Sequence, residues 1–141
     1  MAVHFSSSVK VKLPPKKHLK VWVEKIVFAE KRKLKHLAYN FCSDEELLEK
    51  NKQFLNHNTY TDIITFDYSE EYLISGEVYI SVDRVKENAE KLKVDFSEEI
   101  LRVMAHGVLH LCGYKDKSPI QQKQMRAAEN KALKMFNSIK S

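Results

Sequence analysis

Cysteine, glycine and proline are scarce in this 141-residue sequence, which contains two, three and three of them respectively. Cys42 and Cys112 lie far apart and match no zinc or redox spacing, so we expect two reduced thiols in the core. With 43% hydrophobic residues, so little glycine and proline argues against disorder. No apolar run approaches the roughly 18 residues of a membrane span, and the first residues lack the features of a secretion signal. We expect one domain over residues 1–141, cytoplasmic and without a membrane partner.

Positive charges outnumber negative ones, and the formal net charge is +5. Such a balance favours an acidic partner such as RNA, although many small domains carry a similar charge for solubility. One basic run is concentrated between residues 16 and 35, where it either tracks a phosphate backbone or forms the solvated face of a helix. Its members are Lys16, Lys17, Lys20, Lys25, Lys31, Arg32, Lys33 and Lys35.

Hydrophobic periodicity predicts four strands and five helices. The strands are expected at residues 3–11, 37–42, 62–67 and 72–81, and the helices begin near Pro14, Ser43, Val82, Asp95 and Ser118. Ser43 with Glu46, Asp95 with Glu98, and Ser118 with Gln121 have the spacing of capping boxes. The order β-α-β-α-β-β-α-α-α indicates an α/β (α+β) domain with a mixed four-stranded sheet.

The inward faces of these helices follow from their apolar stripes. They are expected at Leu19, Trp22, Val23, Ile26 and Val27; at Leu47, Leu48, Phe54 and Leu55; at Val82, Val85, Ala89 and Leu92; and at Met125, Ala128, Ala132, Met135 and Phe136. Gly76 interrupts the fourth strand, where it marks either a bulge or a close backbone approach.

His106 and His110 are four residues apart, so on a helix their imidazoles lie on one face. Two neutral imidazoles so placed can occupy two corners of a tetrahedral zinc site. Gly113 follows where a helix often ends, and a chain reversal there would bring Asp116 towards the same ion. The opposite side of this helix is apolar, which predicts a central, largely buried helix whose polar imidazoles need partners. We therefore predict one zinc ion held by His106, His110 and Asp116.

Residues outside this triad are weaker candidates for chemistry. Asp62 and Glu77 are possible bases or partners of a metal ligand, and Lys115 is a possible phosphate contact. Metallopeptidases with the same histidine spacing place a glutamate base directly after the first histidine. Gly107 occupies that position here, which counts against a peptide substrate and leaves phosphodiester cleavage open.

The stretch from His106 to Tyr114 resembles the signature of the YbeY family of bacterial endoribonucleases. Residues 55–56 (LN), 61–66 (TDIITF) and 76–81 (GEVYIS) resemble that family's other conserved blocks, in the same order. The resemblance implies one metal ion, zinc, and a cleft that accepts single-stranded RNA. It also implies work in the cytoplasm on ribosomal RNA, including the 3′ end of 16S rRNA, and on ribosome biogenesis.

Two positions depart from the family pattern. The family usually carries a third histidine at the position of Asp116, and a carboxylate there neutralises part of the ion's charge, so that bound water is less acidified. The family also carries an arginine before its Thr-Asp block, whereas residues 55–62 (LNHNTYTD) contain none. An RNA- or ribosome-associated binding module with a structural metal therefore remains the alternative to an endoribonuclease, and a metallopeptidase is a distant third.

Overall fold

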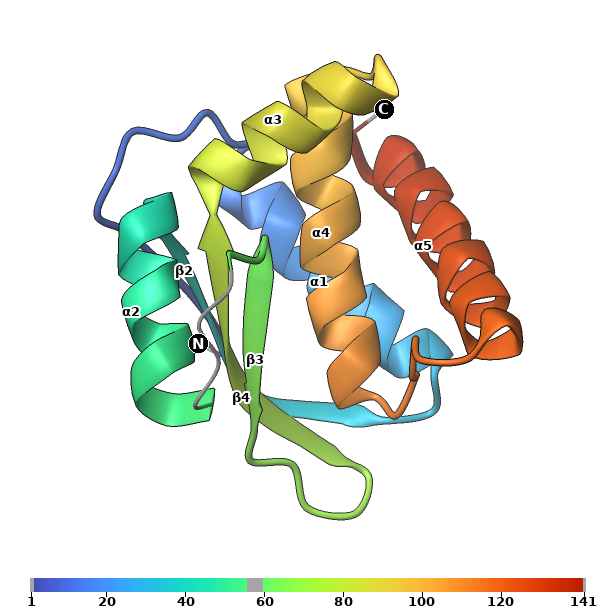
Figure 1. Cartoon of the computed structure of the whole chain (residues 1–141). Coiled ribbons are helices and arrows are strands. Elements are labelled where there is room, and N and C mark those ends of the chain that lie inside the picture. Colours follow the sequence, from blue (N-terminus) through green and yellow to red (C-terminus); the bar gives the residue numbers. More distant parts are fainter. Residues whose placement is uncertain (1, 56–59, 141) are drawn as a thin grey trace.

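The computed structural model describes residues 2–55 and 60–140, and it forms a four-stranded sheet with helices on both faces (Figure 1). The elements, in chain order, are β1 (Val3–Ser7), α1 (Lys16–Ala29), β2 (Lys33–Cys42), α2 (Asp44–Leu55), β3 (Ile63–Asp67), β4 (Leu73–Ser81), α3 (Val82–Leu92), α4 (Phe96–Leu111) and α5 (Pro119–Lys140). The strand order is β1-β2-β4-β3, with β3 alone antiparallel to its neighbour. The predicted mixed α/β sheet is therefore confirmed. None of the described helices has the length and hydropathy to span a bilayer.

The main core lies between the sheet and the layer formed by α1, α4 and α5, while α2 covers the opposite face (Figure 1). Two buried hydrogen bonds tie these layers together. Tyr39 on β2 donates its hydroxyl to the carbonyl of Met104 on α4 at 2.9 Å. Trp22 on α1 donates its indole N–H to the carbonyl of Ala132 on α5 at 2.7 Å. These two hydrogen bonds hold α4 and α5 against the rest of the core. Both helices contribute residues to the site described below.

Glycine allows α4 to lie close against the sheet. A Cβ atom at Gly107 would lie 3.0 Å from Val78 Cγ1, so a side chain at this position would require the Val78 side chain to shift. At Gly76, a Cβ atom would lie 2.5 Å from the carbonyl oxygen of Phe66 and 3.0 Å from Leu111 Cδ1. Gly76 therefore marks a close approach and not a bulge, because its pairing with Leu37 is regular. The space beside it is filled by Leu111, so it admits no substrate.

The strand limits differ from the prediction at two places. The first strand ends at Ser7 instead of residue 11, and just beyond this end the Ser7 hydroxyl donates to the carbonyl of Val9. The second strand begins at Lys33 instead of residue 37, because residues 33 and 34 pair with Leu73 and Ile74. Because the paired residues are far apart in the sequence, no local apolar alternation at residues 33–36 predicts this pairing.

Three apolar side chains predicted to face inward are exposed instead. Phe54 and Leu55 at the end of α2 are 56% and 41% exposed, and Leu92 at the end of α3 is 56% exposed. Each stands in the last turn of its helix. The Phe54 ring makes an edge contact with Phe66, at 5.8 Å between centroids, and has Lys50 Nζ at 5.5 Å from its own centroid. The remaining predicted inward positions are buried or partly buried.

The capping predictions hold at two helices of three. Ser43 and Glu46 exchange backbone-to-side-chain hydrogen bonds of 3.0 and 3.1 Å at the start of α2. Ser118 and Gln121 do the same at 3.1 and 3.2 Å at the start of α5. Asp95 is the N-cap of α4, but its side chain makes no capping hydrogen bond. Both cysteines are free and buried, as predicted, and burial raises the pKa of Cys42 to about 11 and that of Cys112 to about 12.

Candidate metal centre

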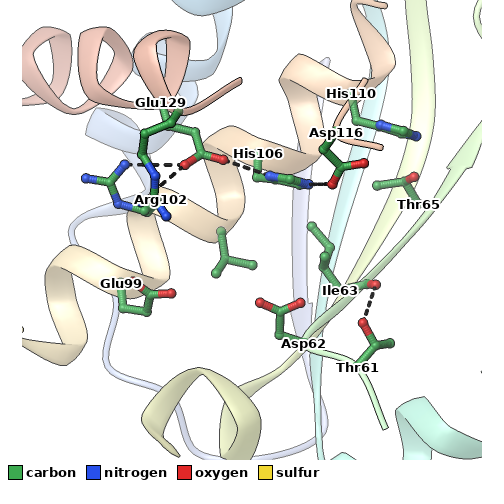
Figure 2. A pocket seen from close by; sticks show the side chains of 12 residues that line it. Thr61, Asp62, Ile63, Thr65, Glu99, Arg102, His106, His110, Asp116 and Glu129 are labelled. Atoms are coloured by element: carbon green, nitrogen blue, oxygen red, sulfur yellow. Dashed lines mark hydrogen bonds and ion pairs between the residues drawn. The ribbon is translucent and has the colours of Figure 1, made fainter. Parts of the chain in front are cut away.

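A cleft of about 390 Å³ opens where the start of β3 faces α4 and α5, and Figure 2 shows the side chains that line it. The α4 wall is a polar stripe on an otherwise apolar helix. Glu99, Arg102, His106 and His110 follow one another at intervals of three or four residues, so they stack along one face. Beyond the first turn, most other side chains of α4 are buried against the sheet and the neighbouring helices. The helix therefore presents the stripe to the cleft.

The end of α4 returns the chain to this stripe. Gly113 adopts a φ of 108°, a left-handed conformation that favours glycine, and its N–H donates to the His110 carbonyl at 3.1 Å. Gln122 of α5 then donates its side-chain amide to the Asp116 carbonyl at 3.1 Å, which anchors the returning loop. As a result, Asp116 Oδ2 lies 3.2 Å from His106 Nε2. The predicted convergence of Asp116 on the helix is thus present for this histidine.

The other nitrogen of His106 contacts a residue that the sequence prediction did not include. Glu129 on α5 places Oε2 at 2.7 Å from His106 Nδ1 (Figure 2). Because an ionised carboxylate only accepts hydrogen bonds, Nδ1 carries a proton in this contact, and Nε2 is the nitrogen that faces Asp116. Glu129 is itself buried, and Arg102 Nη1 at 3.3 Å compensates its charge. Arg126 lies at 3.7 Å from the same oxygen.

The geometry between His106 and Asp116 favours a cation between them. A lone pair and a carboxylate oxygen repel each other at 3.2 Å unless a proton or a metal ion lies between. Two donors about 2.1 Å from a tetrahedral zinc ion stand about 3.4 Å apart, close to the observed separation. Burial lowers the pKa of His106, whereas the hydrogen bond and charge of Glu129 and the charge of Asp116 raise it, and the net shift is upward. The site therefore favours positive charge on or beside Nε2.

His110 lines the same cleft, but its ring is not oriented to bind an ion that lies between His106 and Asp116. Figure 2 shows its ring one turn beyond His106, on the far side of Asp116 and directed away from His106. Within residues 2–55 and 60–140, no three histidine, cysteine or carboxylate side chains stand in a metal-binding arrangement. The separation of His106 Nε2 and Asp116 Oδ2 is compatible with a shared zinc ion, whereas the His110 ring is directed away from them (Figure 2).

The structure places the weaker candidates in three different surroundings. Asp62, directly before β3, lines the cleft, and burial raises the pKa of its carboxyl. Glu77 does not line the cleft; it accepts hydrogen bonds from Tyr68 and Tyr79, and Tyr79 packs with the cluster under α2, on the other face of the sheet. Lys115 is exposed and is not part of the cleft wall. Of the three, Asp62 alone is in a position to act on a ligand in the cleft.

The sequence prediction missed four charged wall residues, namely Glu99, Arg102, Arg126 and Glu129. The signal that would have found the first two is the polar spacing upstream of His106, which continues its face by four and seven residues. Arg126 and Glu129 form the corresponding polar pair on α5, beside the buried Met125 and Ala132. Of the arginine-free stretch 55–62, residues 56–59 lie outside the described part of the chain.

Comparisons with known proteins identify the family of the chain. Residues 4–137 match the sequence model of a family described as "Endoribonuclease YbeY". A Flavobacterium psychrophilum protein named "Endoribonuclease YbeY" is 51% identical over 82% of this chain and 83% of its own length. A Phocaeicola vulgatus protein of the same name is 46% identical over 90% of this chain and 94% of its own. A solution structure from Thermotoga maritima superposes with a TM-score of 0.67 at 30% identity, over 95% of this chain and 88% of that one. The chain belongs to the YbeY endoribonuclease family.

Proposed function

We propose that this chain is a zinc-dependent, single-strand-specific endoribonuclease that acts in the cytoplasm on ribosomal RNA, including the 3′ end of 16S rRNA, during ribosome biogenesis. One observation carries the proposal: His106 Nε2 faces Asp116 at 3.2 Å in an open cleft, while Glu129 holds Nδ1. His106, His110 and Asp116 would hold one zinc ion. Family membership supports RNA as the substrate.

A zinc ion bound there supplies Lewis acidity at a phosphoryl oxygen of the substrate. The chain's own residues supply the remaining parts of the chemistry. Glu129 keeps the His106 ring in one tautomer and orientation. Asp62, whose carboxyl pKa is raised by burial, is suited to accept a proton in the cleft, because a base works best when its pKa approaches the operating pH. Arg102 and Arg126 both pair with Glu129 and so offset part of the negative charge of the cleft wall.

The geometry disfavours the two alternatives. A structural zinc site is closed by four protein ligands, whereas a catalytic one keeps a position open, and the His106–Asp116 pair borders an open cleft. This favours an enzyme over a binding module with a structural metal. A peptidase of the related helical type needs a glutamate at position 107, where a Cβ atom alone would lie 3.0 Å from Val78. The close packing of α4 against the sheet disfavours a glutamate at this position.

The test is cleavage of a labelled single-stranded RNA that carries the precursor sequence beyond the 3′ end of 16S rRNA. Zinc-loaded protein is expected to cut it, and to leave the same sequence uncut in a duplex. His110→Ala should remove most of the activity. His36→Ala is the matched control, because His36 is exposed on β2 and does not line the cleft. Cleavage that persists in His110→Ala would point to a contaminant or another site and overturn the proposal. Precursor rRNA ends compared in cells with and without the protein test the cellular role.

A further inference from the structure

A second hollow, of about 770 Å³, adjoins the cleft at the first turns of α5. It shares four wall residues with the cleft, namely His106, Asp116, Arg126 and Glu129. The two hollows therefore form one groove that passes across the proposed zinc ligands. One arm runs towards Asp62 at the start of β3, and the other runs along α5.

The two arms differ in charge. The β3 arm contains two carboxyls, the buried Glu99 and the partly buried Asp62, and one cation, Arg102, which is already paired with Glu129 at 3.3 Å. A phosphate in this arm would lie beside the negative charges of these two carboxylates. The α5 arm adds Lys123 to the shared residues and adds no further carboxylate. A polyanion that crosses the groove is thus attracted to the α5 arm and repelled from the other.

The cations of the α5 arm are available to a ligand. The Arg126 side chain is 58% exposed, and its one ion pair within the described chain, with Glu129, is long at 3.7 Å and uses Nη1 alone among five N–H donors. Lys123 is exposed and pairs with no residue in the described part of the chain. One turn earlier, Ile120 is 70% exposed on the wall of the same hollow. Two cations and an apolar side chain beside them match the phosphates and the bases of a single strand.

We propose that the first two turns of α5 bind the single-stranded RNA beside the reacting phosphate. Lys123 and Arg126 each contact a phosphate, and Ile120 offers apolar surface to a base. This assignment rests on the proposed endoribonuclease function. It adds that the RNA strand lies on the α5 side of the proposed zinc ligands. It also supplies a phosphate-binding arginine in a chain whose residues 55–62 contain none.

The test measures binding of zinc-loaded protein to a fluorescent 2′-O-methyl oligouridine by anisotropy at several salt concentrations, with the probe checked for integrity on a gel. Lys123→Ala and Arg126→Ala should each weaken binding about tenfold. Each should also reduce the slope of log affinity against log salt by about 0.7, the value for one contact to a single strand. Arg126→Lys should recover part of the loss. Lys131→Ala, an exposed cation on α5 outside both hollows, is the matched control.

The outcomes separate this inference from the function on which it rests. If the parent binds and cleaves RNA, but Lys123→Ala and Arg126→Ala match Lys131→Ala in affinity and salt slope, the α5 assignment is overturned and the endoribonuclease stands. If the parent neither binds nor cleaves single-stranded RNA, both fail. Because Lys123 is exposed and unpaired within the described chain, its variant tests the proposal without endangering the fold.

Discussion

Glu129 of α5 contacts His106 of α4 at 2.7 Å, across 23 residues of sequence, and thereby selects the nitrogen that faces Asp116. The contact depends on the packing of two helices, and that packing is fixed by buried hydrogen bonds from Trp22 and Tyr39 on the other side of the core. The orientation of His106, a proposed metal ligand, therefore depends on the packing of the helical layer. Glu129, His106 and a bound metal ion would form a carboxylate–histidine–metal arrangement.

The first prediction concerns this orienting carboxylate. Glu129→Gln keeps an acceptor near His106 Nδ1 but removes the negative charge that raises the basicity of the ring. Zinc affinity, measured by competition with a chromogenic chelator, should fall about 10- to 100-fold. Glu98→Gln, at an exposed position in the first turn of α4, is the control. Equal zinc affinities of the two variants would mean that Glu129 has only a structural role.

The second prediction concerns the third ligand. Asp116→Ala should release most of the bound zinc during dialysis, as measured by elemental analysis, because it removes the oxygen beside His106 Nε2. Asp116→His should retain the metal, because an imidazole ligates zinc equally well. The control is Asp95→Ala, at an exposed aspartate whose side chain makes no capping bond. Zinc content that is the same in all three variants would exclude Asp116 as a ligand.

Local chemistry made part of this fold readable from the sequence. The capping boxes at Ser43 and Ser118 are contained within four residues, so nothing distant decides them. The apolar side of α4 and the reversal at Gly113 are likewise properties of one helix and its end. These local features were enough to place Asp116 near His106.

The features that the sequence did not reveal depend on distant neighbours. Glu129 looked like one of several charges on α5, because its contact with His106 exists only after α4 and α5 pack. Phe54 and Leu55 continue the apolar stripe of α2, but they lie at the end of this helix, where the neighbouring elements leave them exposed. The early start of β2 depends on pairing with Leu73 and Ile74, 40 residues further along. Tertiary packing, not local propensity, decided each of these.

The third prediction concerns the close approaches at glycine. Gly107→Ala would bring a Cβ atom to 3.0 Å from Val78 Cγ1, a side-chain contact that can partly relax, and should cost about 1–3 kcal/mol of unfolding free energy. Gly76→Ala should cost more, because its Cβ atom would meet the carbonyl oxygen of Phe66 at 2.5 Å, and that backbone is held by the β3–β4 pairing. Urea unfolding gives both values. Ser75→Ala, one residue away, is the control and should change stability little. A Gly76→Ala variant as stable as Ser75→Ala would refute the close approach.

The fourth prediction concerns Asp62, whose carboxyl pKa is raised, chiefly by burial. A carboxyl whose pKa is higher in the folded than in the unfolded protein binds more protons when folded, so stability falls as pH rises from the unfolded pKa through the folded one. Asp62→Asn has no charge to bury. In zinc-free protein it should therefore raise Tm relative to the parent near pH 7, and the difference should shrink as pH is lowered towards the ordinary aspartate pKa. The same variant should lose RNA cleavage if Asp62 accepts a proton in the reaction. A variant that is less stable than the parent at pH 7 would mean that the Asp62 carboxylate is a net stabilising partner in the cleft, for instance through Asn88 Nδ2 at 3.5 Å.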